Sequence, residues 1–262
     1  MNIAIIGGGN LGRALAVGLQ QSTELNVDSI TVTRRSSGRL KDLEDLGILT
    51  SSNNHDAVRN AEIVILSVKP HQIEGVLTEI RADLDPAQHL LISVVTGVSI
   101  HKMHEIVGTI PTCRAMPNTA IAIHESMTCL AVEGLSEAQR DQVVALFESV
   151  GRAVIINEEL MGAATVLGAC GTAYALRYLR ASAQGGVEIG FGADLAQLIA
   201  AQTAKGAARL VLEGGLHPEQ EIDKVTTPMG VTISGLNEME HRGFSSALIK
   251  GLTTSHDKIS NV

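Results

Sequence analysis

The pattern of hydrophobic and polar residues changes near Asn157. Before that residue, short β-rich runs alternate with stretches in which hydrophobic residues recur every three or four positions, as they do in helices. The runs are NIAII (2–6), SITVT (29–33), EIVILSV (62–68), HLLISVV (89–95), PTCRAM (111–116), MTCLAV (127–132) and AVII (153–156). Strands separated by helices indicate parallel pairing through right-handed crossovers. We therefore predict an α/β domain with a doubly wound sheet over residues 1–157.

Two local signals mark helices within this first domain. Leu40, Leu43 and Leu46 have helical spacing and predict a helix that ends at Gly47. Ser136 and Gln139 are spaced as a capping box, which predicts the start of a later helix.

No strand is predicted after Asn157. This residue can cap a helix, and Glu158 and Glu159 suit the positive end of that helix. An Ala-rich stripe follows at helical spacing over residues 198–211. Burial of apolar surface contributes only roughly 25 cal/mol per Å², and Ala buries little of it, so such helices need extensive neighbours. We therefore predict an all-α helical dimerisation domain over residues 158–262.

Composition narrows the classes of protein and partner. The 262 residues suit two domains, and a hydrophobic content of 45% with 2% aromatic residues indicates a core of Ala, Val, Leu and Ile. A net charge of −8 argues against a nucleic-acid partner, because a phosphate backbone demands a basic face.

Three further features bear on location. The uncharged run over residues 160–176 is short and rich in Gly, Ala and Thr, so we predict a buried helix at an interface and no membrane span. The chain begins MNIAIIGGG, without the pattern of a secretory signal. Cys113, Cys129 and Cys170 form no CxxC motif and are interpreted as reduced thiols, so we expect a cytoplasmic protein.

The first chemical motif directly follows the first predicted strand. Residues 7–12, GGGNLG, match G-x-G-x-x-G and precede a helical stretch, which is the context of a Rossmann-like dinucleotide site. Gly7 would permit the tight turn, Gly9 the approach of a pyrophosphate, and Gly12 close packing of the helix on the sheet. The alternative is a glycine-rich turn without a ligand.

The end of the second predicted strand indicates the type of dinucleotide. Sites for NAD usually place Asp or Glu there, whereas this segment reads Thr33-Arg34-Arg35-Ser36. Two guanidinium groups suit a 2′-phosphate, so NADPH is predicted to be preferred over NADH. The alternative is that both arginines are solvated surface charges.

Later strand ends supply candidates for the nicotinamide side. SVKP (67–70), VVTG (94–97) and MPNT (116–119) each close a predicted strand at the edge where α/β sheets bind ligands. Lys69 is either a nicotinamide-ribose contact or a surface lysine. His101 and His104 could share a helix face but have no third ligand, so no metal site is predicted.

The segment 223–236, DKVTTPMGVTISGL, interrupts the helical region with hydroxyls, a proline and two glycines. The chain must bend there, and the amides that open the next helix are free to receive an anion. This segment is the candidate substrate site.

These motifs together resemble the pyrroline-5-carboxylate reductase family. They are, in chain order, residues 7–12, SVKP (67–70), RAMPNT (114–119), GGVEIG (185–190), AAQTAKGAA (200–208), HPEQ (217–220) and the segment 223–236. The resemblance covers nearly the whole chain and implies NADPH-dependent reduction of 1-pyrroline-5-carboxylate to L-proline. The expected assembly is a homodimer through the helical domain or a higher oligomer. A protonated cyclic imine already has an electrophilic carbon, so hydride transfer needs mainly alignment and a partner for the nitrogen.

The resemblance also implies roles for individual residues. The substrate would contact Glu158, Thr227, Gly230, Val231 and Thr232, and the Thr232 hydroxyl would hydrogen-bond the ring nitrogen as the catalytic group. The implied cofactor-binding residues are Ile6, Gly7, Gly8, Gly9, Asn10, Leu11, Gly12, Arg34, Arg35, Ser36, Asn54, Ser67, Val68, Lys69, Pro70, Val95, Thr96 and Asn118.

Two segments depart from the family pattern. GACGTAY (168–174) stands where the family usually reads SGSGPAY, and TPMGVT (227–232) where it reads SPGGxT. Met229 is expected to disfavour a positive φ and to add bulk beside the carboxylate pocket. Two alternatives therefore stay open, namely a reductase of another cyclic imine or ketone and a non-catalytic NADPH-binding paralogue with an interaction role.

Overall fold

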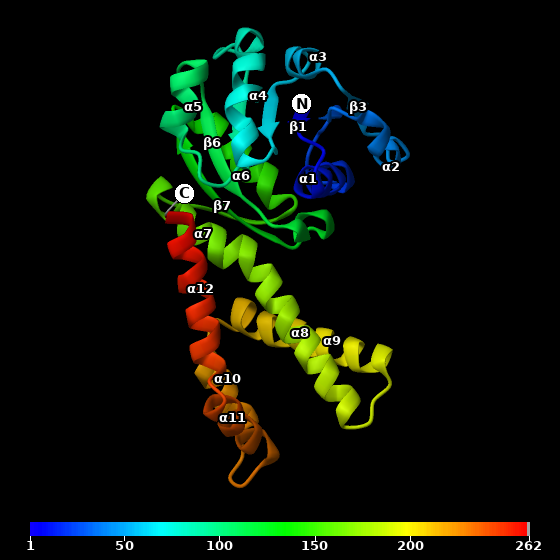
Figure 1. Cartoon of the computed structure of the whole chain (residues 1–262), viewed down its shortest axis with the longest axis vertical. Coiled ribbons are helices and arrows are strands. Elements are labelled where there is room, and N and C mark those ends of the chain that lie inside the picture. Colours follow the sequence, from blue (N-terminus) through cyan, green and yellow to red (C-terminus); the bar gives the residue numbers. More distant parts are fainter. Residues whose placement is uncertain (261–262) are drawn as a thin grey trace. The chain divides into compact units, whose positions relative to one another are not determined.

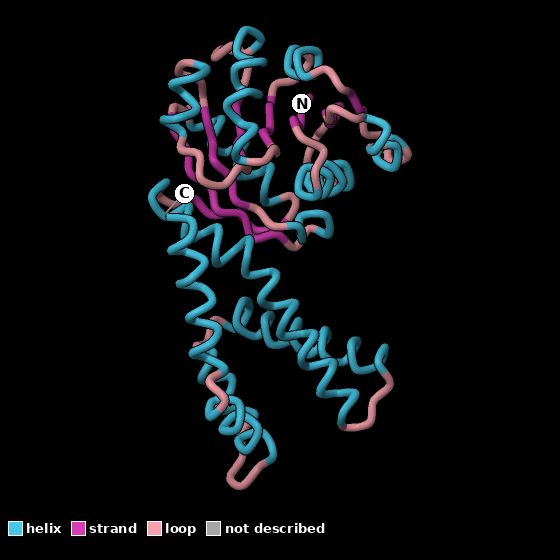
Figure 2. Tube along the Cα trace, in the orientation of Figure 1, coloured by secondary structure: helices cyan, strands magenta, loops and turns pink. Residues whose placement is uncertain are grey.

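The strands predicted in the first half of the chain form one sheet, whose strands and covering helices are drawn in Figures 1 and 2. The structure is a computed structural model that describes residues 1–260. Its contacts separate two units, of which unit 1 holds Met1–Cys170 with the last residues from Lys258, and unit 2 holds Gly171–Asp257.

Within the described residues the sheet of unit 1 has eight strands in the order β3-β2-β1-β4-β5-β6-β7-β8. This order reverses direction between β1 and β4, as in doubly wound dinucleotide-binding folds. The strands are β1 Asn2–Ile6, β2 Ser29–Thr33, β3 Leu49–Ser51, β4 Ile63–Leu66, β5 Leu90–Ser93, β6 Thr112–Met116, β7 Ser126–Glu133 and β8 Gly151–Ile155. The predicted fold class, an α/β doubly wound sheet followed by helices, is confirmed.

Alternating side chains of the central strands are buried on both faces of the sheet. Ile3 and Ile5 pack with α1 (Asn10–Gln21), α2 (Lys41–Glu44) and α6 (Glu137–Glu148). Ala4 and Ile6 pack on the other face with α3 (Asn54–Arg59), α4 (Ile73–Ile80) and α5 (Ile100–Val107). Burial on both faces explains why the strand sequences are almost continuously hydrophobic.

Three sequence expectations for unit 1 need correction. The pairing of β7 with β6 is antiparallel, because the connection through the short 3₁₀ turn η4 (Thr119–Ile123) is too short for a parallel crossover. The strand β3 was not predicted, since three residues give no periodicity. The helix predicted to end at Gly47 ends at Glu44, and Leu46 is exposed.

One helix prediction in unit 1 is confirmed in detail. The Ser136 hydroxyl accepts the amide of Gln139 at 3.3 Å, and the Gln139 side chain accepts the amide of Ser136 at 3.0 Å. This capping box starts α6, whose Phe147 is fully buried.

After Asn157 the described residues form helices joined by short loops. Unit 1 includes η5 (Glu158–Leu160), α7 (Met161–Ala164) and the π-helical turn η6 (Thr165–Cys170). Unit 2 contains α8 Gly171–Glu188, α9 Ala193–Gly214, α10 Pro218–Val225, α11 Val231–His241 and most of α12 Phe244–Ser260.

Long helices with exposed apolar side chains make up unit 2. The Tyr174 hydroxyl lies 2.7 Å from that of Ser255, and the Tyr178 ring meets Phe244 edge-on, so α8 and α12 are linked. Exposed hydrophobic residues of this unit include Leu176, Val187, Leu195, Leu198, Leu210, Leu212, Ile233, Leu248 and Ile249. The single chain therefore leaves a large apolar surface for a partner to cover.

The uncharged run 160–176 is partly buried in the single chain, and its burial at an interface stays a prediction. Met161, Thr165 and Val166 are buried, whereas Leu167 and Leu176 are exposed in the single chain. Among the described residues, the continuous helix Glu158–Glu188 meets the length and composition of a membrane span, criteria that core helices also meet.

A tight turn precedes α11. The amide of Gly230 donates to the carbonyl of Thr227 at 2.9 Å, and Pro228 occupies the second position of the turn. Met229 in the third position has φ of 62°, which corrects the expectation that it would avoid a positive φ. A type II turn requires a positive φ at this position and favours glycine, so the turn imposes the conformation on an exposed methionine.

Replacing Met229 is predicted to relieve this backbone strain. Met229→Gly should raise the free energy of unfolding by about 0.5–1 kcal/mol, because glycine adopts a positive φ without the steric cost that methionine has. Part of this gain is offset, since glycine also increases the conformational entropy of the unfolded chain. Met229→Ala is the matched control, since it removes the same side chain and keeps the penalty. Urea unfolding measures both, and equal stability of the two variants would contradict the assignment of strain.

Candidate functional site

The glycine loop joins β1 to α1 by close backbone packing. Gly7 has φ of 117°, and a Cβ there would overlap the carbonyl of Ser67. A Cβ at Gly12 would overlap the carbonyl of Gly7. Both positions therefore require glycine, and the loop is held against the end of β4.

The side of the loop away from this packing is open. The amides of Gly7 and Gly8 donate to the carbonyl of Thr33 at 3.1 and 2.8 Å, which fixes the loop to the end of β2. A Cβ at Gly9 would meet no atom within 4 Å, and no side chain caps α1. The first amides of α1 are therefore available to an anion.

A cavity of about 1100 Å³ lies at the carboxyl ends of β1, β2 and β4. It occupies the point where the strand order reverses, which is where ligands bind in open α/β sheets. The sequence-predicted residues that line it are Ile6, Gly7, Gly8, Gly9, Asn10, Leu11, Arg34, Arg35, Ser36, Asn54, Ser67, Val68 and Lys69.

Five predicted cofactor residues do not line this cavity. Gly12 lies behind the loop against Gly7, and Val95 is buried. Asn118 caps η4 and donates to the carbonyl of Gly168 at 3.2 Å. Pro70 and Thr96 are also outside the lining.

Sequence reasoning missed a second group of lining residues. They are Arg39, Ser52, His71, Gln72, Gly75, Val76 and Glu79, whereas the lining residues Thr33 and Val94 lie in the segments 33–36 and 94–97 already singled out from the sequence. Gly75, Val76 and Glu79 share one face of α4, and their helical spacing was a usable signal.

One end of the cavity is rich in positive charge. Arg34, Arg35 and Arg39 all line it, and the Arg34 guanidinium donates to the carbonyl of Gly8 at 2.8 Å. The hydroxyl of Thr33 donates to Asn54 Oδ1 at 2.6 Å. The arginines therefore surround the end of β2, where the second sugar of a dinucleotide would lie.

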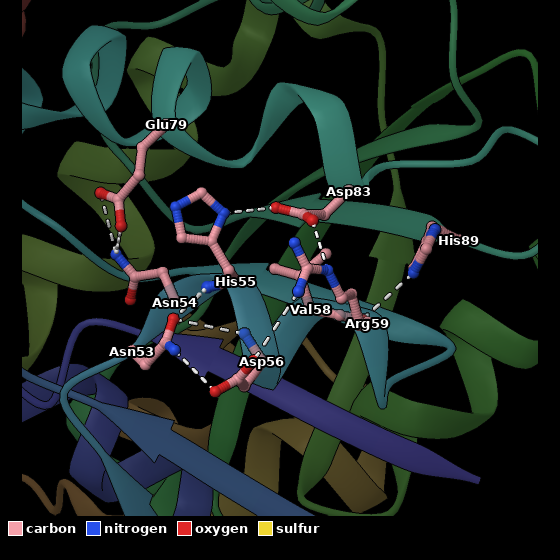
Figure 3. Close-up of polar contacts among 9 residues, drawn as sticks. All are labelled: Asn53, Asn54, His55, Asp56, Val58, Arg59, Glu79, Asp83 and His89. Carbon is pink, nitrogen blue, oxygen red and sulfur yellow. Dashed lines mark hydrogen bonds and ion pairs between the residues drawn. The ribbon is translucent and has the colours of Figure 1, made fainter.

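Helix α3, which carries Asn54, is fixed by a polar network (Figure 3). The Asn53 side chain caps the helix by accepting the amide of His55 at 3.0 Å. The carboxylate of Asp83, 4% exposed, lies 2.6 Å from His55 Nδ1 and 2.6 Å from Arg59 Nε. The hydrogen bond from His55, reinforced by Arg59, lowers the pKa of Asp83 from its usual value of 3.8.

Glu158 has two partners within unit 1, and its contact with a substrate stays a prediction. Its carboxylate accepts the amide of Ile100 at 2.8 Å and the guanidinium of Arg114 at 2.9 Å. It therefore caps the start of α5, and Asn157 makes no side-chain cap for the helix that follows it. Glu158 belongs to unit 1.

The remaining substrate candidates lie together in unit 2. Thr227 and Gly230 close the turn before α11, and Val231 and Thr232 form the first turn of that helix. The amide of Gly230 is used within the turn, whereas the amides of Val231 and Thr232 precede the first intrahelical bond.

The described residues contain no group of three His, Cys, Asp or Glu side chains placed to hold a metal ion. His104 Nε2 lies 3.0 Å from the carbonyl of Ile110 and 2.9 Å from the Thr112 hydroxyl, so this histidine has structural partners. Cys113 is buried, and burial raises the pKa of its thiol to about 12, which keeps the thiol protonated.

Two family models and several known proteins match this chain. A family model for pyrroline-5-carboxylate reductase dimerisation matches residues 158–262, and a model for NADP oxidoreductase, coenzyme F420-dependent, matches residues 2–97. Pyrroline-5-carboxylate reductase 2 of Dictyostelium discoideum is 43% identical over 99% of this chain and 92% of the relative. The chain belongs to the pyrroline-5-carboxylate reductase family.

Two further relatives extend this result. Pyrroline-5-carboxylate reductase 1 of the same organism is 45% identical over 99% of this chain, and the chain spans about half (49%) of its length. The crystal structure of Plasmodium falciparum pyrroline carboxylate reductase with NADP bound has a TM-score of 0.89 at 25% identity and covers 99% of this chain and 97% of that one. The family thus includes a member whose structure contains NADP.

Replacing Asp83 is predicted to loosen the α3 network in a pH-dependent way. The lowered pKa means that the ionised carboxylate stabilises the fold above pH of about 4, and this contribution is lost as the pH falls through the folded-state pKa. Asp83→Asn should lower the free energy of unfolding by about 1–3 kcal/mol at pH 7, because His55 and Arg59 lose their charged partner.

Urea unfolding at pH 7 and near pH 3 measures this effect. The difference in free energy of unfolding between the variant and wild type should shrink at the lower pH. The exposed Asp141→Asn on α6 is the control. A difference that stayed constant with pH would remove Asp83 from this role.

Proposed function

We propose that this chain catalyses NADPH-dependent reduction of the C=N bond of 1-pyrroline-5-carboxylate, giving L-proline. The observation that carries the proposal is the cavity of about 1100 Å³ at the glycine loop, in a chain of the pyrroline-5-carboxylate reductase family. The relatives named above carry this reductase activity in their names.

The residues of the cavity fit a phosphorylated dinucleotide. The open side of Gly9 and the uncapped start of α1 suit a pyrophosphate. Arg34, Arg35 and Arg39 offer guanidinium groups to a 2′-phosphate, which supports a preference for NADPH over NADH. Lys69 and Val94 line the cavity beyond the loop, on the side proposed for the nicotinamide.

The first turn of α11 is proposed to hold the substrate. The amides of Val231 and Thr232 and the hydroxyl of Thr227 would receive the carboxylate, and the Thr232 hydroxyl would meet the ring nitrogen. Gly230 would act through the shape of the turn, because its amide already donates to Thr227. Glu158 would act through the position of α5, whose Ile100 amide it caps.

A bound nicotinamide would supply the hydride. The chain would hold the imine so that its carbon faces that group, and the Thr232 hydroxyl would keep a proton at the nitrogen. No covalent nucleophile is needed, since a protonated imine is already electrophilic.

The assembly is proposed to be a homodimer formed through the helices after Asn157, without nucleic-acid or membrane partners. The exposed apolar side chains of α8 to α12 give such a partner a surface to bury. A second copy would also cover the exposed part of the helix Glu158–Glu188. The three free cysteines suit a reducing compartment and support a cytoplasmic location.

Reduction of a different cyclic imine is the second candidate. Met229 is fully exposed beside the residues proposed for the carboxylate, and the family usually has glycine there. Oxidation of NADPH with pyrroline-5-carboxylate, piperideine and pyrroline-2-carboxylate distinguishes the candidates, and turnover of pyrroline-5-carboxylate should be fastest. Absence of turnover with all three, in a folded protein that binds NADPH, would reject both and leave a binding role.

Thr232→Ala is predicted to lower kcat by about tenfold or more, the loss expected for one hydrogen bond to a charged group. Affinity for NADPH should stay unchanged, because Thr232 is not in the lining of the cavity. Thr226→Ala is the matched control, since its hydroxyl donates to the carbonyl of Asp223 at 3.2 Å. Equal turnover of the two variants would remove Thr232 from the mechanism.

A further inference from the structure

A carboxylate lies at the arginine-rich end of the cavity. Glu79, on the face of α4 that also carries Gly75 and Val76, is the sole acidic side chain among the described lining residues. Both of its carboxylate oxygens accept from Asn54 Nδ2, at 3.1 and 3.2 Å (Figure 3).

The contacts of Asn54 fix the direction in which its amide points. Its Oδ1 accepts the hydroxyl of Thr33 at the end of β2, and its Nδ2 donates to Glu79. The hydrogen-bonded chain Thr33–Asn54–Glu79 therefore connects the carboxylate to the strand end that usually supplies the acidic residue of an NAD site. Arg34 directly follows Thr33, so the end of β2 brings a positive charge to this part of the cavity. Glu79 on α4 brings the negative charge.

The charge of Glu79 is not cancelled by a neighbouring cation. No ion pair of Glu79 is found among the described residues, and Arg34 donates instead to the carbonyl of Gly8. A dianionic 2′-phosphate bound beside Asn54 would feel attraction from the arginines and repulsion from Glu79. A free 2′-hydroxyl would find in Glu79 an acceptor for its proton.

We propose that Glu79 is a specificity-determining residue of the coenzyme site, which lowers the preference for a 2′-phosphate that the arginines create. The proposal rests on the proposed function, because it assumes that the adenosine end of the dinucleotide lies beside Asn54. The coenzyme preference then reflects a balance between residues on β2 and a residue on α4.

Glu79→Gln tests the charge, because glutamine keeps an acceptor for Asn54 and removes the negative charge. Calorimetric titration of the full chain with NADP⁺ and with NAD⁺ gives the ratio of the two affinities without requiring turnover. The variant should raise the ratio in favour of NADP⁺ by about three- to tenfold, the scale of a screened charge interaction, and the increase should fall with added salt.

Two variants frame this measurement. Glu74→Gln removes a carboxylate from the same helix outside the lining of the cavity, and it should leave the ratio unchanged. Replacing Arg34 and Arg35 together by alanine should move the ratio in the opposite direction.

The outcomes separate this proposal from the proposed function. If wild-type protein binds neither dinucleotide, both fail together. If it binds both and Glu79→Gln leaves the ratio unchanged or lowers it, the role of Glu79 alone is overturned. A rise in the ratio with Glu79→Gln and none with Glu74→Gln supports it.

Discussion

The close packing of the glycine loop against the end of β4 is the constraint on which the rest of unit 1 depends. Side chains at Gly7 or Gly12 would collide with backbone carbonyls, so the turn from β1 into α1 can be this tight only with glycine. That turn brings the uncapped start of α1 to the carboxyl edge of the sheet at β1 and β4, where the strand order reverses. This contact therefore forms the glycine-rich side of the cavity. It also points the free amides of α1 toward the place where an anion would bind.

The charges at the far end of the cavity come from elements that lie far apart in the sequence. The arginines follow β2, Asn54 starts α3, and Glu79 ends the exposed face of α4. Asp83, beyond the end of α4, fixes α3 through His55 and Arg59, so it also holds Asn54 in place. A polar network outside the cavity thereby supports the side chains within it.

Sequence reasoning predicted the elements whose patterns are local. The hydrophobic runs predicted seven strands, and the spacing of Ser136 and Gln139 predicted the start of α6. It could not predict the antiparallel β7, which depends on how a short connection closes, or the position of Glu158, which depends on a contact with Ile100 in another element. The spacing of Glu79 with Gly75 and Val76 marks a shared face of α4, but its contact with Asn54 on another helix gives no local signal. Met229 shows a turn overriding the preference of a single residue.

The central claim is that the glycine loop, the end of β2 and the end of β4 together bind a phosphorylated dinucleotide. Hydrogen–deuterium exchange of the full chain with and without saturating NADPH tests it most directly, since amides that receive a phosphate exchange more slowly. The account predicts slower exchange over residues 7–12, 33–36 and 67–69. Slower exchange confined to unit 2, with these three segments unchanged, would contradict it.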